Sequence, residues 1–184
     1  LLIFAGHFVG LLTPIWIFDT LGISHTFKQW MAIGIGGVAG IVDYDAPGFD
    51  RAINAGVYGG YNLLGRDAHW NADLKGGTLA AEGQVTLTVA KGDAGAAGDW
   101  DMTSLAVYAA YRHAFTDYFY LKAKLGVANY EIDTDLSSIY SDKQTGLSAG
   151  IGAGFKVGPG NIEVEVTTHD SDVLFVSGGF HISF

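Results

Sequence analysis

The residues best suited to chemistry are seven charged side chains inside segments that are otherwise apolar or small. They carry four positive and three negative charges: Glu82, Arg112, Lys122, Lys124, Lys156, Glu163 and Glu165. All lie on the less apolar face of alternating segments, so they would meet inside the fold, where an isolated charge is very costly. We expect Arg112 to lie against Glu82 or Glu163, and Lys122 and Lys124 near Glu165. Such a network would plug the interior; the alternative is a gated ion path in which the pairs exchange partners.

A hydrolase would need a nucleophile, a base and an orienting acid. His169, Glu163, His181 and several serines are available, but His169 precedes Asp170 at the start of a loop, which favours a position at a rim. We therefore predict no catalytic residues and no enzyme activity. The six histidines lack the H-x-x-x-H spacing of metal ligands, so neither a transition-metal site nor a cofactor is expected.

Acidic pairs with one intervening residue recur where the chain connects its alternating segments. The pairs are Asp43/Asp45, Asp99/Asp101, Asp133/Asp135 and Asp170/Asp172. None has the twelve-residue EF-hand spacing with a central Gly and a terminal Glu. Two interpretations remain: a solvated, repulsive surface, or weak binding of Ca²⁺ or Mg²⁺.

These side chains must be positioned by β-strands, because apolar residues recur at every second position from Met31 onward. The eight alternating segments are 31–43, 52–63, 78–90, 101–113, 118–131, 145–157, 161–169 and 173–184. The second face of a soluble sheet is rich in Lys, Glu and Thr, whereas here it is mostly Gly, Ala, Ser and Tyr, which suit a narrow lumen. An even number of strands of about this length is typical of a membrane barrel. The predicted fold is all-β: an eight-stranded antiparallel, transmembrane, up-and-down β-barrel over residues 31–184.

Composition agrees with a barrel and excludes several functions. The chain has 184 residues, of which 49% are hydrophobic and only 16% charged, with 27 glycines and no cysteine. Thiol catalysis, disulfides and Cys-ligated metals are therefore excluded. Ten basic against nineteen acidic residues give a net charge of −9, which argues against a nucleic-acid-binding surface. The longer connections 43–51, 91–101, 131–143 and 169–172 hold twelve acids and three bases, which accounts for the whole net charge.

The N-terminal residues 1–30 form a separate hydrophobic segment outside the predicted barrel. Its first 18 residues, LLIFAGHFVGLLTPIWIF, carry no formal charge. Three interpretations stay open: an export signal, an anchoring or packed helix, and a non-native start. A basic n-region and a small-residue cleavage site are not evident, and Pro14 interrupts a helix.

Two further features concern the ends of the barrel. Aromatic residues at strand ends predict girdles at both membrane interfaces, with Tyr61, Tyr111, Phe119, Phe155 and Phe184 at the short-turn rim and Tyr44 and Trp100 near the other. In the stretch 64–77 the apolar residues fall on even-numbered positions, whereas those of the next segment fall on odd-numbered ones. The sequence therefore predicts either a bulge near Gly76 and Gly77 or a longer turn.

The chain resembles the OmpA/OmpX-like family of small eight-stranded outer-membrane barrels. Its end, GGFHISF, is similar to the C-terminal assembly signature of such proteins, with Phe180, Ile182 and Phe184 at alternate positions, although Gly178 departs from the pattern. The other resembling segments are GVYGGYNL at 56–63, LAVYAAYRH at 105–113, YFYLKAKLGVANYE at 118–131 and GLSAGIGAGF at 146–155. The resemblance implies a bacterial outer-membrane location, lipid and lipopolysaccharide as surroundings, and recognition by the barrel-assembly machinery. It says little about function, because the family holds structural proteins, adhesins and, more distantly, lipid-modifying enzymes.

The sequence therefore predicts a monomeric outer-membrane barrel with a structural or surface-interaction role. Contacts with a host or environmental surface would be made by the acidic loops, and cations bound there would be shared with lipopolysaccharide phosphates. A narrow channel for ions or small solutes is the first alternative, and a lipid-modifying enzyme is the second.

Overall fold

The structure, a computed structural model, describes residues 34–65, 70–71, 74–135 and 141–182. The predicted N-terminal segment 1–30 and Phe184 lie outside these residues. Eight strands of ten or more residues make up the fold: β1 (Gly34–Tyr44), β2 (Ala52–Gly65), β4 (Gly77–Ala90), β6 (Asp99–Ala114), β7 (Phe119–Thr134), β8 (Ser141–Val157), β9 (Gly160–His169) and β10 (Val173–Ile182). Two short strands, β3 (Trp70–Asn71) and β5 (Gly92–Asp93), and a 3₁₀ turn, η1 (Gly95–Ala97), are attached to them. No helix in this described part is long and apolar enough to span a membrane.

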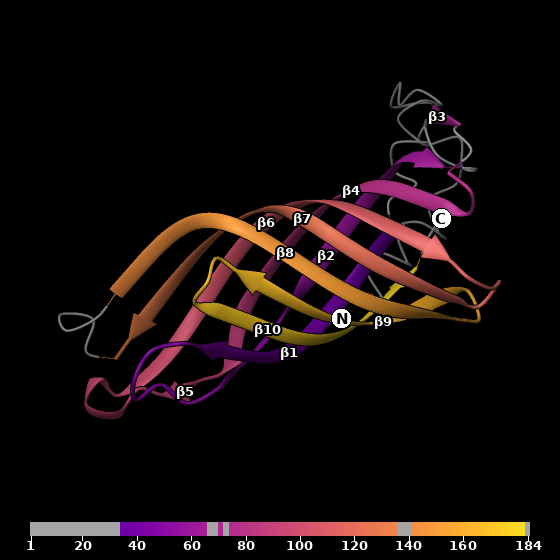
Figure 1. Cartoon of the computed structure of the whole chain (residues 1–184). Helices are drawn as coiled ribbons and strands as arrows, with labels where there is room; N and C mark the ends of the chain where they lie inside the picture. Colours follow the sequence, from indigo (N-terminus) through magenta and orange to yellow (C-terminus); the bar gives the residue numbers. More distant parts are fainter. Residues whose placement is uncertain (1–33, 66–69, 72–73, 136–140, 183–184) are drawn as a thin grey trace, which may run out of the picture. The chain divides into compact units, whose positions relative to one another are not determined.

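The eight long strands close into an antiparallel barrel (Figure 1). Each pairs with its neighbour in the chain, and β1 pairs with both β2 and β10, for example through Ala39 opposite Ala55 and Gly178. The predicted barrel is thus confirmed, and its strand boundaries agree with the sequence segments to within a few residues. Because the sheet is closed, no strand has an unpaired edge where the eight strands overlap. A β-sheet in lipid requires this closure, since its backbone groups find no water to bind there.

Side chains alternate between the lumen and the outer surface, as the apolar pattern requires. In β6, Met102, Ser104 and Ala106 are buried, whereas Leu105 and Val107 are each 56% exposed on the outer face. Apolar side chains on the other strands follow the same rule, including Leu125, Leu147, Ile151 and Val164. The exposed apolar band is therefore the lipid-facing surface of the barrel.

The barrel is uneven at the end where the longer loops lie, here called the loop end. Strands β6, β7 and β8 have 16, 16 and 17 residues, while β9 and β10 have 10 each. Pairing of β8 with β9 begins only at Ser148 opposite His169, so residues 141–147 of β8 extend past β9 beside β7. On the outer face of this part, the apolar side chains end and the polar residues Thr103 and Thr145 follow toward the loop end. The sheet formed by β6, β7 and β8 consequently projects beyond the lipid-facing band.

In the stretch 64–77, the bulge predicted near Gly76 and Gly77 is wrong, because β4 pairs with β6 without a register shift from Gly77 onward. Strand β2 continues to Gly65 with a register shift between Asn62 and Leu64, which is a β-bulge. A turn before β4 places Lys75 and Gly76 at φ of 52° and 87°. The bulge therefore lies earlier in the chain than the sequence suggested, and β3 pairs in parallel with the end of β2. Residues 66–69 and 72–73 are outside the described part.

One predicted girdle is wrong at the loop end. Tyr44 and Trp100 point into the barrel, at 6% and 0% exposure, rather than toward lipid. Their rings pack with Phe49, at centroid distances of 5.2 Å from Tyr44 and 5.6 Å from Trp100. They belong to a buried group that we call the loop-end cluster: Val38, Val42, Tyr44, Ala52, Tyr58, Ala94, Trp100, Met102, Tyr130, Ile132, Val173 and Phe175. The lumen is thus filled by apolar side chains toward this end.

Candidate functional site

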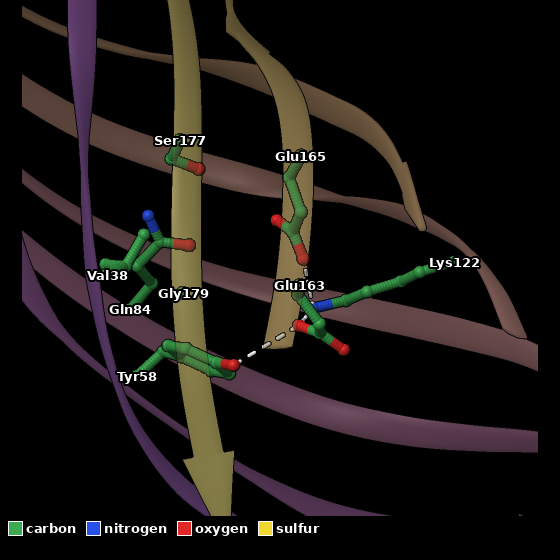
Figure 2. Close-up of a pocket in the computed structure, with 8 residues that line it drawn as sticks. All are labelled: Val38, Tyr58, Gln84, Lys122, Glu163, Glu165, Ser177 and Gly179. Atoms are coloured by element: carbon green, nitrogen blue, oxygen red, sulfur yellow. Dashed lines mark hydrogen bonds and ion pairs between the residues drawn. The ribbon is translucent and has the colours of Figure 1, made fainter. Parts of the chain in front are cut away.

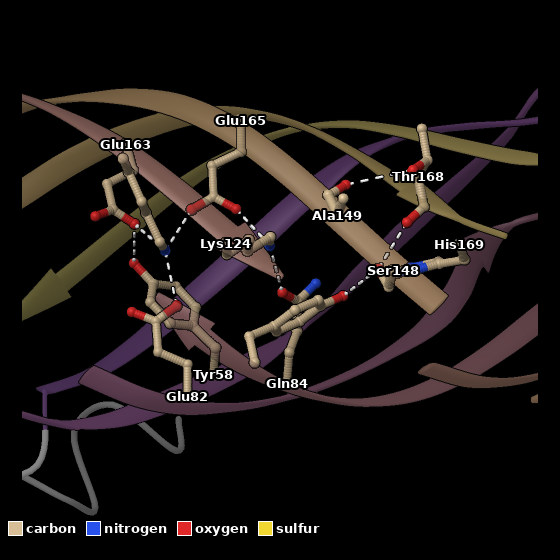
Figure 3. Close-up of polar contacts among 12 residues, drawn as sticks. Tyr58, Glu82, Gln84, Lys124, Ser148, Ala149, Glu163, Glu165, Thr168 and His169 are labelled. Carbon is tan, nitrogen blue, oxygen red and sulfur yellow. Dashed lines mark hydrogen bonds and ion pairs between the residues drawn. The ribbon is translucent and has the colours of Figure 1, made fainter. Parts of the chain in front are cut away.

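Six of the seven charged residues singled out in the sequence meet in the lumen, and we call them the lumen network. Glu82 comes from β4, Arg112 from β6, Lys122 and Lys124 from β7, and Glu163 and Glu165 from β9. Figure 3 shows four of them, Glu82, Lys124, Glu163 and Glu165. Each sits at an inward position of its strand. In the closed sheet β4 lies opposite β9, whereas β7 is separated from β9 by β8 alone. The alternation of the strands is therefore what brings these charges together.

Glu163 and Lys122 are the most connected members of the lumen network. Glu163 accepts from Arg112 Nε and Lys122 Nζ, both at 3.1 Å. Lys122 Nζ also lies 2.9 Å from Glu82 Oε2 and 2.5 Å from Glu165 Oε1. Arg112 forms a second ion pair with Glu82, and Lys124 Nζ lies 2.6 Å from Glu165 Oε2. Every charge of the network thus has at least one opposite charge in contact.

The lumen network is balanced and almost free of solvent. It contains three cations and three carboxylates, and the side chains of Lys122, Lys124 and Glu163 are only 2%, 2% and 3% exposed. Burying an unpaired charge is very costly, whereas a paired and hydrogen-bonded set can be accommodated. The equal number of positive and negative charges therefore matters more for burying this network than the strength of any single ion pair.

The seventh residue, Lys156, was wrongly assigned to the lumen. Its side chain is exposed, and its backbone N–H donates to Tyr118 O at 2.9 Å. Lys156 pairs with Asn161 next to the tight turn between β8 and β9. Strand alternation continues to this position, but the lumen has already ended there, so the side chain reaches solvent.

Tyrosine and histidine side chains complete the surroundings of Glu163. Tyr58 OH donates to Glu163 Oε2 at 3.2 Å, and Tyr120 OH donates to Glu163 Oε1 at 2.6 Å. His181 Nδ1 lies 2.8 Å from Tyr58 OH. The hydroxyl groups of Tyr58 and Tyr120 thus give the carboxylate hydrogen bonds beyond its ion pairs, which fixes its position in the lumen.

The ring of Tyr120 lies against Gly154 of β8, and this contact gives a testable prediction. A Cβ at Gly154 would fall on the Tyr120 ring, so Gly154→Val should displace the tyrosine that holds Glu163. We expect the free energy of unfolding to fall by about 1–3 kcal/mol, a typical cost of overpacking. Urea unfolding in lipid vesicles measures it. Gly83→Val is the matched control, because a Cβ there has nothing within 4 Å; an equal loss in both variants would contradict the prediction.

A small cavity lies beside the lumen network (Figure 2). Its volume is about 10 Å³, and Tyr58, Gln84, Lys122, Glu165 and Ser177 are among its lining residues. That volume is near the minimum of ~10–15 Å³ needed to hold one water molecule. The cavity is therefore too small for an organic ligand.

A buried polar cluster around Ser148 was missed by the sequence analysis. Ser148 Oγ lies 2.9 Å from His169 Nδ1, 3.0 Å from Tyr108 OH and 2.6 Å from Thr168 O. His169, expected at a rim, is fully buried instead. Its inward parity within β9 was the signal that could have placed it. With no exposed surface at Ser148 or His169, a substrate has no access to this pair in the structure.

The acidic residues of the loop end are partly held by the three basic residues of the same region. Arg51 pairs with Asp43 at 3.1 Å, and Lys143 with Glu131 at 3.0 Å. Lys91 Nζ bridges Asp135 at 2.8 Å and Asp101 at 3.2 Å. Of the four acidic pairs, Asp43, Asp101 and Asp135 thus have a protein cation as partner.

Asp45 and Asp172 link two of the acidic loops. These two residues belong to different acidic pairs, yet their loops are joined, because Asp45 N–H donates to Asp172 O at 2.8 Å. The contact uses backbone atoms, and Asp172 Oδ1 accepts from the neighbouring Ser171 Oγ at 2.5 Å. Asp45 itself is exposed. Asp45 and Asp172 therefore connect two loops through their backbone atoms.

The remaining acids of the pairs lie in two strands and a turn. Asp99 and Asp133 lie in β6 and β7, and Asp170 begins the turn before β10 with φ of 58°. Within the described ranges, no group of three or more acids and histidines could hold a metal ion. Spacing by one residue brings two carboxylates into one loop, but a hard cation such as Ca²⁺ takes six to eight oxygen ligands. The solvated surface and weak cation binding both stay predictions for these loops.

The ion pair between Lys91 and Asp135 predicts a measurable shift in the pKa of Asp135. The hydrogen bond from Lys91 lowers the pKa of Asp135 below its ordinary value. A carboxyl with a lowered pKa stabilises the fold above its unfolded pKa, and this contribution is lost as the pH falls through the folded value. Lys91→Gln should therefore raise the pKa of Asp135, as followed by NMR titration of its carboxyl carbon. An unchanged pKa would show that the bridge does not form in solution.

Comparison with known proteins agrees with this architecture. Residues 22–180 match the model of the outer membrane protein beta-barrel domain family. The chain belongs to this family. No curated protein sequence matches it. It is a bacterial outer-membrane protein, as both the family and the solved structures with this fold indicate.

Three solved outer-membrane barrels share the fold at low sequence identity. Neisserial surface protein A is 13% identical with a TM-score of 0.50, over 83% of this chain and 97% of that one. OprG from Pseudomonas aeruginosa is 14% identical with a TM-score of 0.50, over 83% and 95%. The outer membrane enzyme PagL is 14% identical with a TM-score of 0.51, over 82% and 99%. These likenesses show the fold alone.

The prediction that the chain is not an enzyme is wrong as stated. PagL, a barrel of the same fold, is an outer-membrane enzyme, so neither the fold nor its class excludes catalysis. The strand pattern does not show that a protein is non-catalytic. A barrel can carry catalytic side chains while its apolar and polar residues still alternate along each strand.

The predicted C-terminal signature lies partly in the described region. Phe180 is 41% exposed on the outer face of β10, and its ring lies over Gly160 of β9. Ile182 is the last residue of β10 and pairs with both Ile35 and Gly160. These two residues thus belong to the strand that closes the barrel.

Proposed function

We propose that this protein is a structural and surface-contact barrel of the outer membrane whose lumen is closed to ions. The observation that carries this proposal is the occupation of the lumen by two successive layers of side chains. The lumen network is charge-balanced, and the loop-end cluster above it contains Trp100, Ile132 and Phe175 at 1% exposure or less. An ion would have to displace both a set of satisfied charges and an apolar layer, each at high cost.

The surface-contact role rests on the projecting part of β6, β7 and β8. This sheet carries Asp101, Glu131 and Lys143 on its outer face beyond the lipid-facing band, so it is placed to meet molecules outside the membrane. Its surroundings would be lipid and lipopolysaccharide, whose phosphates would supply the ligands that the acidic loops lack for a shared cation. Phe180 and Ile182 would serve recognition by the barrel-assembly machinery, and the external ligand would be a host or environmental surface. No second copy of the chain is required.

A narrow channel is the second candidate, and one observation favours it. Lys122 contacts three carboxylates, Glu82, Glu163 and Glu165, so its pairs have alternative partners and could exchange. The same arrangement that closes the lumen would then act as a gate.

Single-channel recording in planar bilayers separates the two candidates. The purified, folded protein should give no steady openings in the proposed role. Steady openings whose conductance changes in Arg112→Gln or Glu82→Gln would overturn it in favour of the channel. Lys143→Gln is the matched control, because this exposed cation lies outside the lumen.

A further inference from the structure

A chain of hydrogen bonds connects His181 of β10 to the lumen network. His181 is 6% exposed and lies near the short turn between β8 and β9, at the end of the barrel that we call the turn end. Its Nε2 lies 3.1 Å from Asn161 Nδ2, and its Nδ1 lies 2.8 Å from Tyr58 OH. Tyr58 OH in turn donates to Glu163 Oε2 at 3.2 Å (Figure 2). One buried imidazole is thus linked, through a single tyrosine, to one of the two most connected members of the network.

The direction of these hydrogen bonds places the proton of His181. An amide nitrogen can only donate, so Asn161 Nδ2 donates to His181 Nε2, which must carry a lone pair. The proton of the neutral ring is then on Nδ1, which donates to the oxygen of Tyr58, whose own hydrogen goes to Glu163. Every donor in this chain has an acceptor. The arrangement therefore corresponds to a neutral imidazole protonated at Nδ1.

The charges around His181 are balanced only while its ring is neutral. Among the described residues, the charged side chains that act on it electrostatically are two carboxylates and two cations: Glu163 of β9, Glu82 of β4, Arg112 of β6 and Lys122 of β7. Lys156 of β8 is exposed next to Asn161, and β1 places Gly36 opposite His181. A proton on His181 would therefore add a positive charge without a matching carboxylate. Such a charge is very costly to bury unless the existing pairs rearrange.

Arg112 is the member of the network that can give up a contact to a protonated His181. His181 Nδ1 lies 3.8 Å from Glu163 Oε1, and Arg112 Nε donates to the same oxygen at 3.1 Å. Two cations at one oxygen repel each other, but Arg112 has a second carboxylate partner in Glu82. At 18% exposure, the side chain of Arg112 is also the most exposed of the network. It can therefore leave Glu163 and remain paired.

We propose that His181 is a pH-sensitive switch at the turn end of the lumen network. Histidine is the side chain whose charge ordinarily changes between about pH 5 and pH 8. Uptake of one proton at Nε2 gives the ring two N–H donors and a positive charge. The carboxamide of Asn161 then turns to present its oxygen to Nε2, and Glu163 exchanges Arg112 for His181.

The switch would act on the turn end alone. The loop-end cluster contains neither a histidine nor a carboxylate, so protonation leaves the apolar layer in place while the pairs at the turn end rearrange. The inference rests on the closed lumen proposed above and adds a regulation to the same network.

NMR titration of ¹⁵N-labelled protein in lipid nanodiscs, from about pH 8 to about pH 5, tests the switch. At the upper pH, the ring nitrogens of His181 should report a proton on Nδ1 and none on Nε2. On acidification Nε2 should become protonated, and the side-chain nitrogens of Asn161 and Arg112 should shift with the same midpoint. A proton on Nε2 at the upper pH, a ring that stays neutral throughout, or a titration that Asn161 and Arg112 do not follow would overturn the proposal.

Two variants assign the shifts to His181. Glutamine is neutral at every pH, so in His181→Gln the side-chain nitrogens of Asn161 and Arg112 should no longer shift. His169→Gln is the matched control, because His169 is also buried in the lumen but contacts Ser148 instead; here the shifts should keep their midpoint. Shifts that persist in His181→Gln, or that vanish in His169→Gln, would contradict the switch. The titration of the unaltered protein decides by itself if His181→Gln does not fold.

Planar-bilayer recording keeps this test separate from that of the proposed function. Steady openings at neutral pH would contradict the closed lumen whatever His181 does. A barrel that stays closed but shows no coupled titration contradicts only the switch.

Discussion

Replacement of Glu163 by glutamine is expected to lower the free energy of unfolding by about 3–5 kcal/mol, the range for breaking a buried ion pair. Glu163 contacts Arg112 and Lys122, both at 3.1 Å. Without its charge, three buried cations would face two carboxylates in a region almost free of solvent. Glutamine keeps the size of the side chain, so the loss would report charge rather than packing. Urea unfolding in lipid vesicles, followed by tryptophan fluorescence and by migration in SDS without boiling, provides the measurement.

The control for this variant is Glu131→Gln on the outer surface. Glu131 pairs with Lys143 at 3.0 Å, but the two side chains are 44% and 63% exposed. Exposed pairs contribute about 0–1 kcal/mol because water solvates the separated charges well. Equal losses from the two variants would mean that the lumen network is as hydrated as the surface.

Replacement of Phe175 by alanine should produce the second large effect. Phe175 is 1% exposed within the loop-end cluster, so alanine leaves a cavity among Trp100 and its neighbours. A buried Phe→Ala change costs about 3–5 kcal/mol, from lost burial and from the cavity that remains. We also expect faster hydrogen exchange at amide groups of the lumen, because the apolar layer that separates them from loop-side water is opened.

Phe155→Ala is the matched control for Phe175. Phe155 is 54% exposed on the lipid-facing surface, where lipid can fill the space of the missing ring. Its unfolding free energy should change less than that of Phe175→Ala, and lumen exchange should not change. Comparable exchange rates in both variants would contradict a barrier role for the loop-end cluster.

Strand alternation made most of this architecture predictable from the sequence. A period of two places every second residue in the lumen, so Glu82, Arg112 and Glu163 could be placed on the inner face without coordinates. The need to pair buried charges then limits which of them meet. Antiparallel closure followed from the even number of similar segments.

The errors arose where alternation alone does not decide the environment. Lys156 has lumen parity but lies next to a tight turn, where the barrel has ended. Tyr44 and Trp100 have inward parity, yet their position near a rim suggested a lipid-facing girdle; the structure packs them on Phe49 instead. The contact between Ser148 and His169 depends on the register of β8 against β9, which a single sequence does not specify.

The acidic loops show the same limit at the loop end. Local spacing grouped Asp45 with Asp43 and Asp172 with Asp170, whereas the structure joins Asp45 to Asp172 through their backbones. This contact exists because β1 pairs with β10 up to Tyr44 opposite Val173, which places the loop after β1 beside the loop before β10. Barrel closure, rather than spacing along the chain, therefore decides which acids become neighbours.

The central claim is that the six charges form one coupled network that closes the lumen. A double-mutant cycle between Lys122→Met and Glu163→Gln tests it most directly, with unfolding free energies measured for both single variants and the double variant. We expect the double variant to lose less stability than the sum of the single losses, by about 1–3 kcal/mol, because the second change restores the balance of charge. Losses that add to within about 0.5 kcal/mol would contradict a coupled network.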